Sequence, residues 1–415
     1  MSLLLVTMVD NAGVVRGKMT PHPDDGVARL GLSPVLNRYL VDDAIADPES
    51  EIGPIGAMWL VSDASARVPL TDEVTWAPAW QQSADGEPMP GCQRHFLQRQ
   101  VEAAAGAGIV VAGGFELEWF AGRSDNTFLP RFCGPGYGAV TLVDASDYVV
   151  DLARGFEQAD LGLRQLHAEY APGQFELSLD PAPPLQLADN FVAARQLVHL
   201  VTGRHGGRAS LAPVLPGQAV GNGAHLTLSF RRPDEPFVGP SGELSRFGGA
   251  IVAGLLAHLP ALVAVGCGLS CSYSRLVPGK WACGYECWGW DNREAAVRLT
   301  RSTDDHVRVE LKFPDCSANP YTLVGAAIAA ALDGLARGLT APEPVRQAPQ
   351  LLEHPPSRLP TDIRAATAAL RADQVLAQAL GADLLDSLLA TRLGEAQRAD
   401  ALEPDEDLGT VMWRL

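Results

Sequence analysis

The chain has 415 residues, of which 47% are hydrophobic and 20% are charged, and this composition is typical of a soluble globular protein. Such a length allows two or three domains, or one large unit with a small companion. A formal net charge of −17 argues against nucleic acid or an anionic membrane as the main partner.

The first part of the chain predicts a small β-rich domain. Residues 3–9 are apolar and favour a strand, and residues 14–18 fit the returning strand of a hairpin. Residues 59–63 and 74–76 fit further short strands. A unit of this size is too small to hold a deep active site alone.

A polar passage with glycine and proline at residues 81–91 predicts the linker to a second part. We therefore divide the chain into an N-terminal domain, residues 1–85, and a larger domain, residues 86–415. Helical periodicity at residues 94–105 opens the second part, and residues 147–166 predict another helix.

Between these two helices, the stretch from Gly114 to Phe120 alternates apolar and acidic side chains. In a strand, Glu116 and Glu118 point to the same face because the side-chain period is two. Two like charges on one face repel, so the pattern requires metal ions, cationic side chains or open water. Taken alone, this segment favours a solvated strand face.

Acidic or imidazole side chains recur beside strand-like residues in three later stretches, which are residues 167–179 with Glu169 and Glu176, residues 220–230 with His225, and residues 307–313 with Glu310. A lone histidine is more often structural than a ligand. The glycine turn before His225 favours a ligand, because glycine lets the backbone approach one closely.

The longest apolar stretch, residues 250–270, is interrupted by His258 and Pro260. This interruption favours a buried helix followed by a loop over a membrane span. Residues 321–339 and 362–395 predict helices in the last part of the chain.

Seven cysteines are scattered along the chain, and no charged segment precedes an apolar signal core at the N-terminus. We therefore expect the protein to lie in the reducing cytoplasm. The pairs Cys267/Cys271 and Cys283/Cys287 lack the ligand spacing of a zinc ribbon, so we expect them to be buried small side chains.

Taken together, these segments resemble the glutamine synthetase superfamily, of the type I-like fold, over nearly the whole chain. The resemblance is carried by Glu116-Leu117-Glu118, the His-Ala-Glu run that continues to Glu176, the Gly-Asn-Gly-Ala-His at His225, the Ser-Tyr-Ser-Arg-Leu-Val-Pro-Gly at Arg275, Asn292-Arg293 with Arg298, Arg308, Glu310, Phe313-Pro314-Asp315 and Ala318-Asn319-Pro320-Tyr321. Motifs in this order are far more specific than a lone short motif.

The resemblance implies an α+β fold, with a small β-grasp-like N-terminal domain and a large catalytic domain whose curved antiparallel sheet is flanked by helices. It also implies metal ions on the inner face of that sheet. Six side chains are then the metal ligands: Glu118, Glu169 and Glu176 for the ion nearest the acid substrate, and Glu116, His225 and Glu310 for the ion that engages ATP phosphates. Carboxylates with one imidazole suit Mg²⁺ or Mn²⁺.

The implied activity is ATP-dependent joining of a small-molecule acid to an amine through an acyl phosphate. A carboxylate and a phosphate repel each other, so positive charge must neutralise both before the γ-phosphoryl group moves. By resemblance, Arg293, Arg298 and Arg308 supply that charge. The substrate-binding residues are Arg275 for the α-carboxylate of the acid, Gly221 for its amino group, and Tyr137, Trp281 and Lys312.

Trp281 departs from the ammonia-using enzymes, where a flap glutamate that takes a proton from ammonium stands at this position. An indole carries only an N–H donor and cannot act as a general base. Glu286 is the nearest acidic candidate in the sequence. A bulky aromatic side chain suits an organic amine that packs against it, at about 0.5–2 kcal/mol for a cation–π contact.

Two further departures concern the acid substrate and the neighbouring subunit. Lys312 stands where the family usually has an arginine, and an ammonium does not replace a bidentate fork. The Asp-Gly-Ser-Ser loop that reaches a neighbouring subunit in glutamine-forming relatives is absent, although Asp42, Asp43 and Asp47 lie nearby.

The sequence thus favours the branch that forms γ-glutamyl amides, from glutamate or a close analogue and an organic amine. A catalytically silent homologue that serves as a scaffold is the first alternative, and an ammonia-using glutamine synthetase is the second. By resemblance, we expect a homo-oligomer of stacked hexameric rings.

Overall fold

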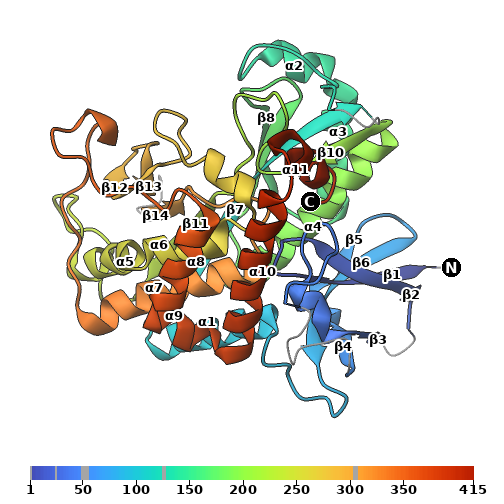
Figure 1. The fold of residues 1–415 in the computed structure, drawn as a ribbon, viewed down its shortest axis with the longest axis horizontal. Helices are drawn as coiled ribbons and strands as arrows, with labels where there is room; N and C mark the ends of the chain where they lie inside the picture. Colours follow the sequence, from blue (N-terminus) through green and yellow to red (C-terminus); the bar gives the residue numbers. More distant parts are fainter. Residues whose placement is uncertain (1, 24–25, 48–55, 124–127, 302–306) are drawn as a thin grey trace.

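The computed structural model describes residues 2–23, 26–47, 56–123, 128–301 and 307–415 (Figure 1). The N-terminal part forms a mixed sheet of β1 (Leu3–Val9), β2 (Val15–Pro21), β3 (Arg29–Leu32), β4 (Met58–Ser62), β5 (Val68–Pro69) and β6 (Val74–Gln82). The strand order is β2-β1-β6-β4-β3, with β5 beside β6. The pair β1/β6 is parallel, and the other pairs are antiparallel.

The predicted strands of the N-terminal part are confirmed, but β6 is longer than expected. It was predicted over residues 74–76 and continues to Gln82, inside the predicted linker, because its later residues pair with β4. The domain boundary between residues 85 and 86 stays a prediction.

The larger sheet carries the acidic stretches. Its strands are β7 (Val110–Arg123), β8 (Leu163–Ala168), β9 (Gln174–Leu179), β10 (Gly207–Ser210), β11 (Leu226–Arg231), β12 (Tyr285–Trp290), β13 (Ala295–Arg301) and β14 (Val307–Leu311). Their order is β12-β13-β14-β11-β7-β9-β8, with β10 paired to β7. The α+β fold class is confirmed. One correction concerns the antiparallel sheet, because β12 and β13 run parallel.

Helices flank this sheet, with α3 and α4 near β8 and β10, and α5 to α9 together on the other side in Figure 1. The helices are α1 (Gln93–Gly106), α2 (Ala139–Asp144), α3 (Ser146–Gln158), α4 (Pro184–Arg204), α5 (Arg246–Ala257), α6 (Leu259–Gly266), α7 (Pro320–Arg337), α8 (Ile363–Ala372), α9 (Gln374–Leu380), α10 (Ala382–Asp400) and α11 (Pro404–Val411). Short 3₁₀ turns lie at Pro34–Arg38, Ala64–Ala66, Ser270–Ser274 and Pro349–Leu351.

Two predicted helices are wrong in extent. The helix predicted over residues 147–166 ends at Gln158, because Asp160 adopts a left-handed φ of 52° and the chain then enters β8. The helix predicted over residues 362–395 is three helices. Asp373 caps the second of them, and Gly381, at φ 82°, separates the second from the third.

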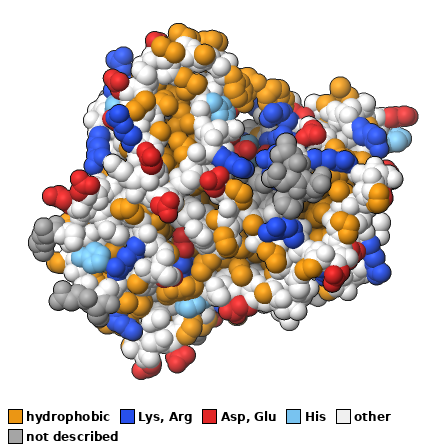
Figure 2. Space-filling model, turned by 180° about the vertical axis from the view of Figure 1, so that it is seen from behind, with side chains coloured by type: hydrophobic (Ala, Val, Ile, Leu, Met, Phe, Trp, Pro, Cys, Tyr) orange, Lys and Arg blue, Asp and Glu red, His pale blue; other side chains and the backbone are white. Residues whose placement is uncertain are grey.

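The apolar stretch at residues 250–270 is buried, as predicted, but two helices rather than one precede the loop. The chain bends by 66° between α5 and α6, with Pro260 in the first turn of α6. Within the described residues, no single helix has the length and apolar character to cross a membrane, although this bent pair meets that test jointly. On the face seen in Figure 2, acidic and basic side chains are interspersed among hydrophobic ones.

The cysteines of the two pairs were predicted to be buried small side chains, and the structure agrees. All seven cysteines are free, and the four in the two pairs are buried. Burial raises the pKa of the Cys283 thiol to about 12, so it stays protonated and weakly reactive at neutral pH.

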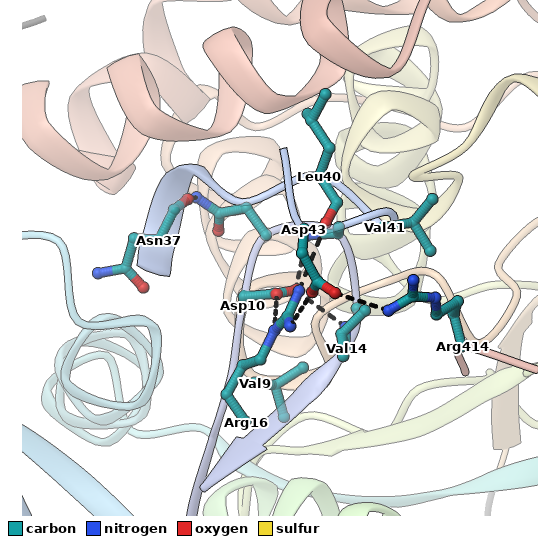
Figure 3. Close-up of polar contacts among 12 residues, drawn as sticks. Val9, Asp10, Val14, Arg16, Asn37, Leu40, Val41, Asp43 and Arg414 are labelled. Carbon is teal, nitrogen blue, oxygen red and sulfur yellow. Dashed lines mark hydrogen bonds and ion pairs between the residues drawn. The ribbon is translucent and has the colours of Figure 1, made fainter. Parts of the chain in front are cut away.

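A chain of ion pairs ties the N-terminal part to the end of the polypeptide (Figure 3). Arg16 Nε lies 2.8 Å from the buried Asp10 Oδ2, and its guanidinium also pairs with Asp43. Arg414 Nη1 lies 2.6 Å from the second oxygen of Asp43. Asp43, one of the acids near the position of the absent inter-subunit loop, is therefore paired within its own chain.

His258, at the bend between α5 and α6, is buried between two aspartates. Its Nδ1 lies 2.6 Å from Asp373 Oδ2 and its Nε2 lies 3.0 Å from Asp333 Oδ2. Burial opposes protonation, but these two carboxylates raise the pKa of His258 above its ordinary 6.5. Protonation is therefore favoured by the folded state, whereas the unfolded chain titrates near pH 6.5.

We expect His258→Gln to be more destabilising at pH 6 than at high pH. The stabilisation from the charged imidazole is fully present below the unfolded pKa and is lost as the pH rises through the raised folded pKa. Urea unfolding of both proteins across this range measures the difference. A stability gap that grows with pH would contradict the assignment.

Candidate active site

The register of the larger sheet brings the predicted ligands side by side. Glu118 on β7 lies opposite Glu176 on β9, and Glu176 lies opposite His167 on β8. On the other side of β7, the Glu116 N–H donates to the His225 carbonyl at 3.0 Å. Sequence positions far apart therefore meet on one face because antiparallel pairing aligns residues of like orientation.

These side chains line a cavity of about 500 Å³. Every predicted site residue except Arg308 is among its lining residues: Glu116, Glu118, Tyr137, Glu169, Glu176, Gly221, His225, Arg275, Trp281, Arg293, Arg298, Glu310 and Lys312. Polar side chains that converge in one cavity are what a substrate site is expected to show.

The first acidic cluster comprises Glu116, His225 and Glu310, the predicted ligands of the phosphate-side ion. His225 Nδ1 lies 3.1 Å from Glu116 Oε2 and 3.7 Å from Glu310 Oε1. Although burial opposes it, the hydrogen bond from His225 lowers the pKa of Glu116 to about 2. The Glu116 carboxylate therefore stays ionised at neutral pH.

The second acidic cluster comprises His167, Glu169 and Glu176. His167 Nε2 lies 2.9 Å from Glu169 Oε1 and 3.4 Å from Glu176 Oε2. Burial, together with the charges of Glu118 and Glu116, raises the pKa of Glu176 to about 7. Like charges thus crowd this end of the site. The sequence reasoning missed His167, although the strand period places it on the same face as Glu169.

Glu118 lies between the two clusters. One of its oxygens accepts the Gly223 N–H at 2.9 Å and a Gln174 amide N–H at 3.3 Å. The other lies 3.8 Å from His225 Nε2. The described side chains that come closest together around Glu169 and Glu176 include His167 rather than Glu118. The assignment of Glu118, Glu169 and Glu176 to one ion stays a prediction.

The donor chemistry of both clusters fits divalent ions. In each cluster, one ligand atom from each of the three residues lies within 4.8 Å of the others. Each offers two carboxylates and one imidazole, a set that suits Mg²⁺ or Mn²⁺. Burial first, and then repulsion from Glu118 and Glu116, raise the pKa of Glu176, and a bound cation would relieve that repulsion.

Two cationic side chains hold Glu310 from outside the first acidic cluster. Arg298 Nη1 lies 3.0 Å from Glu310 Oε2, and Lys312 Nζ lies 3.3 Å from Glu310 Oε1. Arg308 is exposed and precedes Glu310 by two positions on β14, so both side chains leave the same face. A second cavity of about 800 Å³ lies beside Ser229 and Arg231, and Arg308 is not among the described residues that line it.

Arg275 and Gly221 adjoin each other, as their predicted roles on one substrate require. Arg275 is buried, and its Nη1 donates to the Phe313 carbonyl at 3.1 Å and lies 3.3 Å from Asp315 Oδ2. A Cβ at Gly221 would lie 2.2 Å from the Pro213 carbonyl oxygen and 2.8 Å from Arg275 Cγ. This position therefore requires glycine.

Aromatic rings form one wall of the cavity. The rings of Tyr137 and His167 are stacked at 5.2 Å, Tyr137 meets Tyr170 edge-on at 5.1 Å, and Tyr170 meets Trp281 edge-on at 5.4 Å. Arg293 approaches the Trp281 ring at 5.8 Å. Tyr170 follows Glu169 directly and was not among the predicted site residues.

Glu286, the acidic candidate suggested by the sequence, lies on the edge strand β12 and is not among the described residues that line the cavity. The carboxylate bound to the loop of Trp281 is instead Glu294. Its Oε1 accepts the Trp281 N–H at 3.1 Å, and its Oε2 accepts the Gly279 N–H at 2.9 Å. Sequence reasoning also missed this residue, because its partners are backbone groups.

The family model described as glutamine synthetase, catalytic domain, matches residues 90–407. Gamma-glutamylpolyamine synthetase GlnA3 of Streptomyces coelicolor is 37% identical to the chain over 435 residues, covering 99% of this chain and 93% of the relative. Glutamine synthetase of Thermus thermophilus is 32% identical over 311 residues, covering 72% of this chain and 70% of the relative.

Two solved structures share the whole fold. A crystal structure of a novel glutamine synthase homolog superposes with a TM-score of 0.86 and 27% identity, covering 98% of this chain and 97% of the other. A GmaS/ADP complex superposes with a TM-score of 0.85 and 26% identity, covering 98% of this chain and 96% of the other.

Proposed function

The chain belongs to the glutamine synthetase family, and from this premise we propose that it joins an organic amine, rather than ammonia, to the γ-carboxylate of glutamate. The enzyme is an ATP-dependent C–N ligase, as its family is, so the alternative of a silent scaffold protein is rejected. Each acidic cluster brings together three side chains that could hold a metal ion, which agrees with activity.

One observation carries the choice of amine. Trp281 lines the cavity, and the sequence resemblance gives it the position of the flap glutamate of ammonia-using relatives. Its N–H cannot take a proton from ammonium, but its ring offers an apolar and π-rich surface to an alkylammonium. A polyamine is the first candidate, because a relative that aligns over 99% of the chain at 37% identity is a gamma-glutamylpolyamine synthetase.

The proposed roles follow the geometry. Bound Mg²⁺ or Mn²⁺ would supply the charge neutralisation that lets the γ-phosphate of ATP meet the glutamate carboxylate. Arg298 and Lys312 brace Glu310, and Arg275 with Gly221 would hold the amino-acid end of glutamate. Phosphoryl transfer gives ADP and a γ-glutamyl phosphate. The amine nitrogen then attacks the acyl carbon and loses a proton, and phosphate leaves.

The nucleotide is proposed to extend from the first acidic cluster toward the second cavity. Thr227, Ser229 and Arg231 alternate along β11 on the face of His225, and Arg308 lies one pleat from Glu310 on β14. Arg308 would then contact phosphate oxygens on the outer side. A homo-oligomer is proposed from family membership, and its size is measurable by light scattering.

The test is phosphate release by the purified protein with ATP, Mg²⁺ and glutamate across a panel of amines that includes ammonium, butylamine and 1,4-diaminobutane. We expect higher kcat/KM for the organic amines. Release at full rate with ammonium alone would overturn the proposal in favour of ordinary glutamine synthesis. Replacing glutamate by shorter and longer dicarboxylic amino acids tests the acid.

We expect Trp281→Glu to raise kcat/KM for ammonium at least about tenfold, since a positioned general base contributes about 10²–10⁴ to such a reaction. The use of 1,4-diaminobutane should fall because the apolar surface is lost. Trp281→Phe is the matched control, since it keeps the apolar ring without adding a base. Equal ammonium rates in all three proteins would count against this role of Trp281.

A further inference from the structure

The loop that carries Trp281, residues 278–283, is held in an unusual conformation, and we name it the strap. Gly279 has φ 80°, Trp281 has φ 56° and Cys283 has φ 59°. Non-glycine residues rarely adopt this left-handed region and keep it only where their surroundings hold them there. The groups that hold the strap therefore decide where the Trp281 ring lies.

Glu294 is the main holding group. Its two carboxylate oxygens accept the N–H groups of Gly279 and Trp281, at 2.9 and 3.1 Å. Hydrogen bonds to an ionised acceptor are about twice as strong as neutral ones. Lys280, between these two residues, donates from Nζ to the Ala219 carbonyl at 2.8 Å. The strap is thus fastened to Glu294 and, through Lys280, to the backbone at Ala219.

Glu294 is itself fixed from behind. It is only 7% exposed and lies just before β13, and its N–H donates to Asn292 Oδ1 at 3.0 Å. Asn292 Nδ2 in turn donates to the Val345 and Gln347 carbonyls at 2.9 and 3.0 Å. Glu294 is not among the described residues that line the cavity, so it acts through the strap rather than on substrate.

Fastening the strap completes the aromatic wall. Trp281 is 44% exposed, and its ring meets Tyr170, which meets Tyr137 beside the second acidic cluster. The three rings form a row of successive contacts that ends at His167 in the second acidic cluster. An extended aliphatic chain fits such a row, because its methylenes contact ring faces and its ammonium groups gain cation–π contacts.

We propose that Glu294 is a positioning residue that sets amine specificity, by holding Trp281 in a three-ring wall that takes an extended aliphatic amine with a second ammonium group. This proposal rests on the proposed function, since it concerns the amine of the same reaction. Glu294 determines the affinity for that amine, and the acid and nucleotide subsites do not depend on it.

The test compares Glu294→Ala and Glu294→Gln with the wild type, with Asp362→Asn as the matched control. Asp362 also accepts a backbone N–H, from Ala365 at 2.8 Å, but at the start of α8. We expect the KM for 1,4-diaminobutane to rise about tenfold in Glu294→Ala and less in Glu294→Gln, which keeps one acceptor oxygen. The KM values for glutamate and ATP, and the kcat at saturating amine, should stay near those of the wild type.

Hydrogen exchange of the strap amides, measured by mass spectrometry without substrate, tests the hydrogen bonds from the strap to Glu294 independently of the reaction. Faster exchange in Glu294→Ala, with no change in Asp362→Asn, is expected. Unchanged exchange would show that Glu294 does not hold the strap. A parallel rise in the KM values for glutamate and the diamine would overturn the role of Glu294 in amine specificity. If the wild-type protein uses only ammonium, the proposed function and the amine assignment are both overturned. The exchange result would still decide whether Glu294 holds the strap.

Discussion

Replacing Glu116 by Gln is expected to lower kcat/KM for ATP by about two to three orders of magnitude, because it turns a carboxylate ligand into a neutral amide. Glu116 and Glu310 both lie within 4 Å of His225 Nδ1, at 3.1 and 3.7 Å. The first acidic cluster would keep one carboxylate to face a divalent ion. Initial rates of phosphate release at varied ATP and Mg²⁺ measure the loss, which high Mg²⁺ should partly offset.

Glu118→Gln is the matched variant, since it makes the same chemical change two positions along the same strand. Glu118 lies between the clusters, next to Gly223 and Gln174 on the acid side. We expect this variant to raise the KM for glutamate more than the KM for ATP. If both variants raise the same KM equally, the two glutamates do not serve different ions.

Asp189→Ala is expected to lower the free energy of unfolding by about 3–5 kcal/mol, which is typical when one partner of a buried ion pair is removed. Arg94 Nε and Nη2 lie 3.1 and 2.7 Å from the two oxygens of Asp189, and both residues are buried. The Tyr321 hydroxyl also donates to Asp189 at 2.7 Å. Removing Asp189 therefore leaves a buried guanidinium with fewer partners.

The control for this prediction is Asp63→Ala. Asp63 pairs with the same guanidinium at 2.9 Å, but its side chain is 15% exposed and can be replaced by water. A loss of about 1 kcal/mol is expected. Urea unfolding of the three proteins at pH 7 gives both values, and an equal loss from the two substitutions would show that the pair with Asp189 is not the stronger anchor.

The prediction of the site depended on two kinds of signal. Alternation in Glu116-Leu117-Glu118 indicated two carboxylates on one face but left open whether water or a metal met them. The ordered motifs then linked this strand to Glu176, His225 and Glu310, which no local pattern does. Sheet pairing in the structure places all of them at one cavity.

The errors have identifiable physical causes. The helix that was predicted to continue to residue 166 stops because Asp160 is left-handed and the residues after it gain more by pairing with β9. Amphipathic periodicity at residues 362–395 hid two breaks, although Asp373 and Gly381 are the cap and linker residues that signal them. A helical period alone does not show where a helix restarts.

The sequence by itself determined the family, and by resemblance it predicted the chemical types of the metal ligands and the replacement of the flap glutamate by Trp281. These features depend only on which residues occur and in what order, and the sequence gives both. Only the tertiary structure decided that His167 joins the second acidic cluster, that Tyr170 extends the aromatic wall and that Glu294 accepts hydrogen bonds from the strap. Each of these contacts joins side chains or backbone N–H groups whose proximity is set by strand register and loop conformation, and no local pattern of residues encodes that proximity.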